Sequence, residues 1–251
     1  MTESRAREFW DETRWGAFVT GSGAFLVAAG FTGIILSLLS DVLYASGQPT
    51  DAAGYIQVFS QHQLLAFSDW TIRIIGDFWL VPASIAVYLA LRRINRPAAV
   101  VGTLLSLAYI IYDVNLTATN SLNLVRLADG YASAATAALK ANYVAAATAG
   151  VNALPLQTFF SFAIGAVGWL LWSLIMARSF FGKWSAIFGV VANLMGLLGG
   201  AGALVQGTPY HLLGVFTTFG AIATALWFIF VGVRLFRHGN HLRKGERPIP
   251  Y

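Results

Sequence analysis

The chain has 251 residues, of which 57% are apolar and only 11% are charged, and its mean hydropathy is +0.65. Soluble proteins carry about 25% charged residues, so this composition excludes a soluble globular enzyme and a disordered regulator. The formal net charge of +5 does not indicate a nucleic-acid partner, because the basic residues lie at the ends of apolar runs, as membrane topology requires. With no cysteine, the chain has neither a disulfide nor a thiolate metal site.

Six apolar runs are long enough to cross a bilayer as helices, since one span needs about 20 residues. They cover residues 16–40, 67–91, 97–124, 155–177, 185–205 and 212–235. Two connections between spans are also predicted to be helical. Residues 50–63 begin with an N-cap at Thr50-Asp51, and the Ala-rich residues 132–150 run into the fourth span with a kink at Pro155. The predicted fold class is therefore all-α, a six-transmembrane-helix bundle with short outer helices.

The distribution of Lys and Arg predicts the orientation of the bundle. Of the 16 basic residues, 13 lie near the N-terminus, in the turns 92–96 and 178–183, or from Arg234 onward, and only Arg126 and Lys140 flank the opposite side. Because cytoplasmic loops carry the excess of basic residues, we expect both termini in the cytoplasm and a multi-pass protein of the inner (cytoplasmic) membrane. The predicted organisation is a cytoplasmic N-terminal segment (1–15), a six-span transmembrane domain (16–237) and a basic cytoplasmic tail (238–251).

The second span and the turn after it carry a family resemblance. They read Asp77-Phe-Trp-Leu-Val-Pro-Ala-Ser-Ile-Ala-Val-Tyr-Leu-Ala-Leu-Arg-Arg-Ile-Asn-Arg96. This run is similar to the second span of a bacterial and archaeal multi-pass membrane family catalogued only as a domain of unknown function, whose members tend to read Leu-x-x-x-Leu-Tyr-x-Leu-Leu-Arg-x-Val-Asn-Arg there. Residues 178–189 and 227–237 also resemble that family. The resemblance implies the fold and the membrane location over residues 20–237 but no activity, and this chain lacks the acidic residue that such families often carry in the last span.

Ionisable side chains inside the spans are the candidate functional residues, because each costs about 2.5–3.5 kcal/mol on insertion into hydrocarbon. The second span carries Asp69, Arg73 and Asp77 at positions i, i+4 and i+8, on one helix face. Counted at 1.5 Å per residue from residue 67, Arg73 lies about 9 Å and Asp77 about 15 Å below the outer boundary. Asp113 in the third span falls in the same outer half, so Arg73 is predicted to pair with Asp77 or Asp113. The predicted ligand-binding residues are Asp69, Arg73, Asp77, Tyr109, Tyr112, Asp113, Asn120 and Asn193.

Several interpretations of these polar residues compete. They form either a satisfied network that fixes helix register, or an outward-facing pocket that binds or senses a small amphipathic or lipid-like ligand, which we favour. A rival is an intramembrane isomerase, cyclase or hydrolase of lipid-like substrates, with Asp77 or Asp113 as the catalytic general acid and Arg73 as the anchor. A proton-coupled transporter ranks last, because only Pro82 and Pro155 interrupt the spans.

The fifth span carries a stripe of small or polar residues that predicts close helix packing. Its members are Ser185, Gly189, Asn193, Gly196 and Gly200. We expect this stripe to pack inside the bundle, with a homodimer through the fifth span as the alternative. Membrane lipids are the other expected partners.

The histidines do not form a metal motif. His62 and His211 lack the carboxylate or cysteine spacing of a metal site, so neither a metal nor a cofactor is predicted, although a haem or metal at this pair stays an open alternative. His238 and His241 are predicted to be solvated in the basic tail. Three tryptophans near span ends are predicted to be interfacial anchors: Trp15, Trp70 and Trp184.

Overall fold

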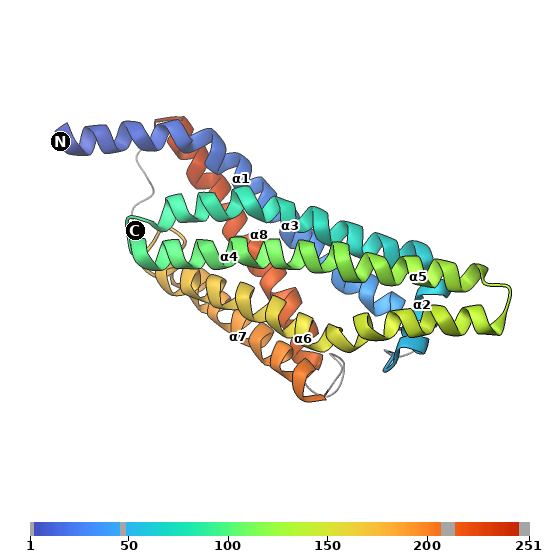
Figure 1. The fold of residues 1–251 in the computed structure, drawn as a ribbon. Coiled ribbons are helices and arrows are strands. Elements are labelled where there is room, and N and C mark those ends of the chain that lie inside the picture. Colours follow the sequence, from blue (N-terminus) through green and yellow to red (C-terminus); the bar gives the residue numbers. More distant parts are fainter. Residues whose placement is uncertain (1–2, 46–48, 207–213, 246–251) are drawn as a thin grey trace.

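The computed structural model describes residues 3–45, 49–206 and 214–245 (Figure 1). Within these ranges the regular secondary structure is entirely helical. Its elements are α1 (Glu3–Leu43), α2 (Ala52–Gln61), α3 (Gln63–Leu91), α4 (Arg96–Leu116), the π-helical turn η1 (Thr117–Ser121), α5 (Leu122–Ser133), α6 (Ala137–Met176), α7 (Gly182–Gln206) and α8 (Gly214–Arg243). Six helical segments are long and apolar enough to cross a membrane, with α4, η1 and α5 forming one of them. The predicted all-α bundle of six spans is therefore confirmed.

Side-chain caps and one glycine set where several helices begin. Asp51, Asn95 and Thr136 each accept a hydrogen bond from the amide three residues further on, at 2.8, 3.2 and 3.2 Å, and thereby start α2, α4 and α6. Asp51 is thus the cap predicted for the first outer helix. Gly182 has φ of +75° where α7 begins, a left-handed conformation that glycine adopts without steric penalty. The connections that precede α4, α6 and α7 are short.

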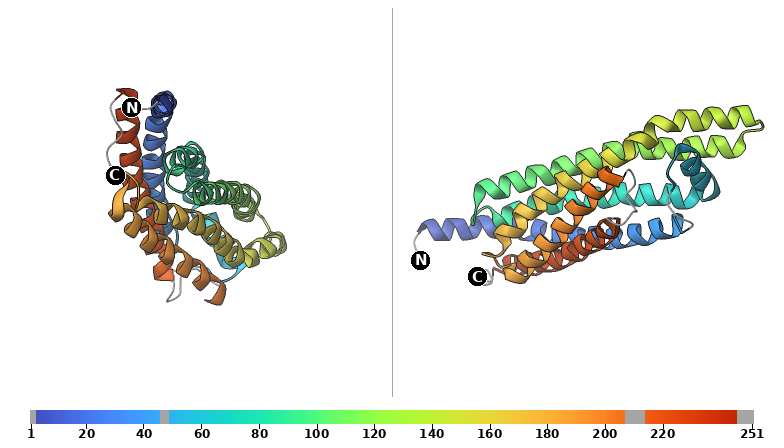
Figure 2. Two further views of the ribbon diagram at one scale, coloured as in Figure 1. Left: turned by 90° about the vertical axis from the view of Figure 1, so that its left-hand side faces the viewer. Right: turned by 90° about the horizontal axis from the view of Figure 1, so that it is seen from below.

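The six spanning segments form a closed ring. Each packs mainly on its two neighbours, in the order α1, α3, α4–α5, α6, α7, α8 and back to α1 (Figure 2). The seam between α1 and α8 is close, because a Cβ atom on Gly232 would lie 2.8 Å from the backbone of both Gly23 and Val27. Apolar side chains fill part of the space inside this ring, and the rest is a cavity.

The segment 96–133 and helix α6 extend well beyond the thickness of a bilayer. The segment 96–133 has 38 residues and α6 has 40, so at 1.5 Å per residue each is close to 60 Å long, against a hydrocarbon core of about 30 Å. Their paired ends project beyond α1 and α8 at the end of the bundle opposite the start of α1 (Figure 2). The Ala-rich outer helix predicted for residues 132–150 and the fourth span are thus one helix, with Pro155 inside it.

Apolar side chains gather in two separate clusters. The inner cluster fills the ring towards the basic turns, and its largest fully buried members are Trp172, Trp227, Phe181 and Leu235. The outer cluster joins α2 to α5 and to the first half of α6. Its members are Leu43, Ala52, Tyr55, Ile56, Phe59, Ala66, Leu124, Ala128, Ala147 and Val151. The predicted polar residues of the spans lie between these two clusters.

The glycine stripe of the fifth span packs inside the bundle, as predicted. A Cβ atom on Gly200 would lie 3.1 Å from the Phe162 Cβ of α6, and one on Gly220 of α8 would lie 2.7 Å from the backbone nitrogen of Gly196. A Cβ on Gly196 itself would meet only the Phe162 ring, at 3.7 Å. Helices α7 and α8 therefore approach closely because Gly220 has no side chain.

His238 is not solvated, and the prediction for it was wrong. Helix α8 continues to Arg243, so the first residues of the predicted basic tail are helical. His238 is 9% exposed and stacks on the Phe180 ring at 4.0 Å. The reason is that the turn before α7 folds against α8, where the Arg234 guanidinium donates hydrogen bonds to the carbonyl oxygens of Phe180 and Phe181.

Candidate functional site

A cavity of about 600 Å³ occupies the space between the two apolar clusters. All six spanning segments contribute to its wall, and its volume falls in the range of about 300–1,000 Å³ typical of small-molecule sites. Asp41 and Thr50 line it and are exposed, which places its mouth beside α2. The polar residues of its wall are Thr32, Ser37, Ser40, Asp41, Thr50, Asp69, Arg73, Asp77, Asp113, Thr117, Ser121, Asn152, Gln157, Thr158, Ser161, Asn193, Thr217, Thr218 and Thr224.

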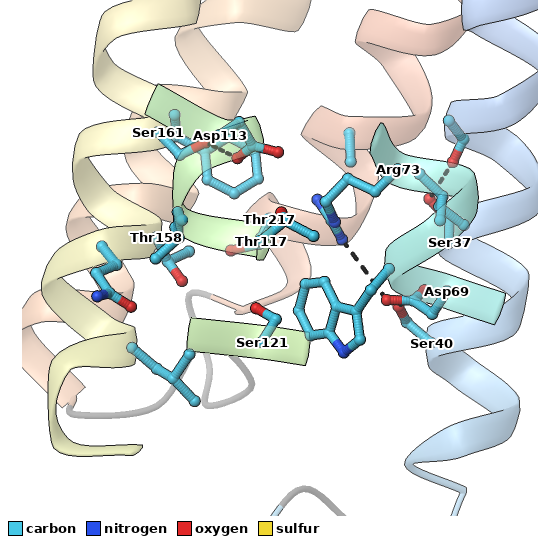
Figure 3. Close-up of a pocket in the computed structure, with 18 of the residues that line it drawn as sticks. Ser37, Ser40, Asp69, Arg73, Asp113, Thr117, Ser121, Thr158, Ser161 and Thr217 are labelled. Atoms are coloured by element: carbon cyan, nitrogen blue, oxygen red, sulfur yellow. Dashed lines mark hydrogen bonds and ion pairs between the residues drawn. The ribbon is translucent and has the colours of Figure 1, made fainter. Parts of the chain in front are cut away.

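The wall nearest the mouth carries the one positive charge among the described lining residues. Arg73 and Asp69 lie one turn apart on α3, and Arg73 Nη2 is 3.9 Å from Asp69 Oδ2. Ser40 on α1 donates a hydrogen bond to Asp69 Oδ1 at 3.3 Å, and the guanidinium lies 5.1 Å from the centre of the Trp70 ring. Asp69 is 4% exposed, whereas 32% of the Arg73 side chain remains accessible. Arg73 therefore reaches into the cavity, as Figure 3 shows.

This arrangement corrects the predicted partner of Arg73. The ion pair of Arg73 is with Asp69 rather than with Asp77 or Asp113, because the i, i+4 neighbour towards the mouth is the nearer carboxylate. Trp70, for which the sequence predicts a role as an interfacial anchor, lines the cavity, and its indole nitrogen has no hydrogen-bond partner among the described residues.

Deeper in the cavity two carboxyl groups meet from different helices. Asp77 on α3 and Asp113 on α4 are each 4% exposed. Tyr109 donates a hydrogen bond to Asp77 Oδ1 at 3.3 Å, and Ser161 on α6 donates one to Asp113 Oδ1 at 2.5 Å. The Oδ2 atoms of both residues have no hydrogen-bond partner among the described residues. This pair therefore retains acceptor capacity that the described residues do not use.

Aromatic rings close the inner end of the cavity. Trp169 of α6 packs edge-on against Tyr109 and Phe228, with 4.9 Å between ring centres in both pairs. The Trp169 indole nitrogen donates to Ser106 Oγ at 3.0 Å, which fixes the ring in place. Trp169 and Phe228 belong to the inner apolar cluster, which also contains Trp172 and Trp227. The cavity is therefore a cup with an aromatic floor, open at one end.

The wall formed by α7 and α8 adds uncharged polar groups. Asn193 is 1% exposed and donates through Nδ2 to the Gly189 carbonyl at 2.7 Å, but its Oδ1 atom has no partner. The Thr217 hydroxyl on α8 also has none. The Asn193 side chain is thus held by its own helix through Nδ2, while its Oδ1 atom accepts no hydrogen bond from the described residues.

Sequence patterns did not predict the π-helical turn η1 in the cavity wall. Thr117 and Ser121 at its two ends are 1% exposed and line the cavity. Asn120 within the turn donates to the Gly150 carbonyl at 3.1 Å and to Gln157 Oε1 at 2.8 Å, which ties the turn to α6. Single π-turns inside α-helices often mark functional sites. No residue type in 117–121 distinguishes such a turn from ordinary helix.

The structure brings six of the eight predicted ligand-binding residues to the cavity wall. These are Asp69, Arg73, Asp77, Tyr109, Asp113 and Asn193. Tyr112 does not line the cavity, because it is rotated by about 100° from Asp113 around α4. Asn120 is also outside the wall, since its amide is engaged with α6. His62 is exposed where α2 meets α3, and His211 lies outside the described residues.

Fold and site together define the class of the protein: an all-α, multi-pass membrane protein with a polar cavity inside a ring of six spans. No family model, no curated protein and no solved structure matches the chain, so the family resemblance of the second span stays a prediction.

Proposed function

We propose that the protein binds or senses a small amphipathic or lipid-like ligand in this cavity, which faces the outside of the cytoplasmic membrane. The cavity itself is the observation that carries the proposal. Its wall joins charged groups such as Arg73 and Asp77 to apolar ones such as Leu36, Leu116 and Phe162. A ligand that has both a polar and an apolar part matches such a surface.

The distribution of charge supports the outward direction. The basic turns lie at the closed end of the cup, beside the inner apolar cluster, and the mouth lies at the other end with α2. Since basic turns stay in the cytoplasm, the mouth opens outward. A ligand then enters from the outer leaflet or from the space outside the cell.

The second candidate is an intramembrane enzyme, favoured by one observation. Asp77 and Asp113 are buried carboxyls, each with one oxygen that has no hydrogen-bond partner among the described residues, and Arg73 lines the same cavity as a possible anchor for a substrate. Such carboxyls can donate a proton to a bound substrate. Turnover of a bound lipid-like compound that is lost in Asp77→Asn, while the compound still binds, distinguishes this function from simple binding.

Mass spectrometry of compounds that co-purify with the protein tests the binding function. The test variant is Ala221→Trp, because Ala221 of α8 lines the cavity and an indole there fills part of it. The matched control is Leu226→Trp on the same helix, since Leu226 is 44% exposed and is not part of the wall. We expect an amphipathic compound to co-purify with wild type and Leu226→Trp and to be depleted in Ala221→Trp.

Retention of every co-purifying compound in Ala221→Trp would contradict the proposal, provided the variant melts like the control. Compounds that remain in both variants are lipids on the outer surface of the bundle.

A further inference from the structure

The charges that line the cavity do not balance. Among the described lining residues there are four carboxyl groups, of Asp41, Asp69, Asp77 and Asp113, and one guanidinium, of Arg73. Arg73 forms its ion pair with Asp69. The two deepest carboxyls are left with single hydroxyl donors, from Tyr109 and Ser161. A buried carboxylate in hydrocarbon needs a positive partner or a proton.

The floor beside these carboxyls is the kind of surface that holds an organic cation. The rings of Tyr109, Trp169 and Phe228 all line the cavity. Aromatic faces attract ammonium and other organic cations through the ring quadrupole, and more strongly where water is excluded. Carboxyls above an aromatic floor therefore combine two attractive contributions for the same kind of ligand.

A second helix wall provides an independent acceptor. Asn193 on α7 lines the cavity and is only 1% exposed. Its Oδ1 atom has no hydrogen-bond donor among the described residues. Asp77 on α3 and Asp113 on α4 also line the cavity and each has one oxygen without a donor, so three helices of the wall carry an acceptor that no described donor satisfies. A cationic group that sits there has acceptors on several sides.

The side chains around this space suit an organic cation better than a metal ion. Across the described ranges, no group of three or more His, Cys, Asp or Glu residues is arranged to hold a metal. Ca²⁺ takes about six to eight oxygen ligands within about 2.6 Å, whereas this space has a volume of about 600 Å³ and partly apolar walls.

We propose, building on the ligand-binding function above, that the ligand of this cavity is a hydrophobic organic cation whose charged group lies between the Asp77–Asp113 pair and the aromatic floor of Tyr109, Trp169 and Phe228. Figure 3 shows Asp113 and Arg73 on opposite sides of the space. Arg73 neutralises Asp69 near the mouth, so the inner carboxyls are the part of the site that selects a positive charge.

Two probes of the same shape and opposite charge test this proposal: tetraphenylphosphonium and tetraphenylborate. Binding is measured by equilibrium dialysis to the full chain in lipid nanodiscs, with empty nanodiscs subtracted. We expect the phosphonium to bind one per chain and the borate not to bind. Asp77→Asn and Asp113→Asn are each expected to weaken phosphonium binding by about tenfold or more. Asp129→Asn is the matched control, because Asp129 is exposed on α5 and outside the cavity wall.

The possible failures are distinguishable. Borate binding that Ala221→Trp abolishes, without phosphonium binding, would overturn the cation proposal and leave the ligand-binding function in place. Phosphonium binding that neither Asp77→Asn nor Asp113→Asn changes would also overturn it. If neither probe binds and no compound co-purifies, the cation proposal and the binding function both fail. The comparison of the two probes on wild type needs no variant, so the test holds even if a carboxyl variant does not fold.

Discussion

Removing Arg73 tests whether the ion pair on α3 holds the cavity wall together. Arg73 Nη2 lies 3.9 Å from Asp69 Oδ2, and at an effective dielectric constant of about 20 two unit charges at this distance attract by about 4 kcal/mol. Because 32% of the Arg73 side chain is accessible in the cavity, water screens part of this attraction. We expect a coupling free energy of about 1–3 kcal/mol between the two residues.

A double-mutant cycle measures this coupling. Thermal unfolding in one detergent is recorded for wild type, Arg73→Met, Asp69→Asn and the double variant. Arg73→Met leaves Asp69 without its cation, so Asp69→Asn should recover part of the loss. For a chain of this size each kcal/mol shifts the melting temperature by about 2–4 °C. A second cycle of Arg73→Met with Asp129→Asn is the control, since Asp129 is exposed on α5.

If the coupling free energy in the Asp69 cycle is zero, as it should be in the control cycle, the pairing is refuted. Arg73 is then solvated by cavity water alone. A larger coupling of Arg73 to Asp77 or Asp113 than to Asp69 would refute the assigned partner.

Three other predictions follow from the packing and the topology. Gly220→Ala should lower the melting temperature by the equivalent of about 1–3 kcal/mol, because its Cβ meets backbone, whereas Gly196→Ala should not lower it; equal effects would contradict the α7–α8 contact. Reporters inserted at residues 92–95 and 134–136 should report cytoplasm and outside respectively, and the reverse result would overturn the orientation. Asn120→Ala should speed amide hydrogen exchange in α5 and the first half of α6, since two bonds to α6 are lost; unchanged exchange would exclude this tether.

The spans and several of their ends follow directly from the sequence. Long apolar runs have few alternatives to membrane helices, because every backbone polar group must be satisfied within the segment. Asn95 followed by Arg96-Pro97 is typical of a helix start, and Asn95 is the cap of α4 in the structure. The i, i+4, i+8 spacing of Asp69, Arg73 and Asp77 likewise places them on one face, and all three line the cavity.

Contacts between helices do not follow from such patterns. Hydropathy gives the depth of Asp113 but not the rotation of α4, so Asp113 and Tyr112 looked equivalent although only Asp113 faces the cavity. The meeting of Asp77 with Asp113 depends on α3 and α4 being neighbours in the ring. The π-turn η1 and the contact of His238 with Phe180 arise from packing between segments distant in sequence, which leaves no local signal.

Thiol labelling of single-cysteine variants in intact cells tests most directly that the cavity is open to the outside and closed to the cytoplasm. The chain contains no cysteine, so each variant reports one position. Ser37→Cys on α1 and Thr158→Cys on α6 place a thiol on opposite walls of the cavity, and Ser185→Cys places one in the inner core, where Ser185 is 0% exposed. A membrane-impermeant maleimide added outside should label the first two variants and not the third. Labelling of Ser185→Cys from outside, or no labelling of either wall variant until the cells are lysed, would contradict an outward-opening cavity.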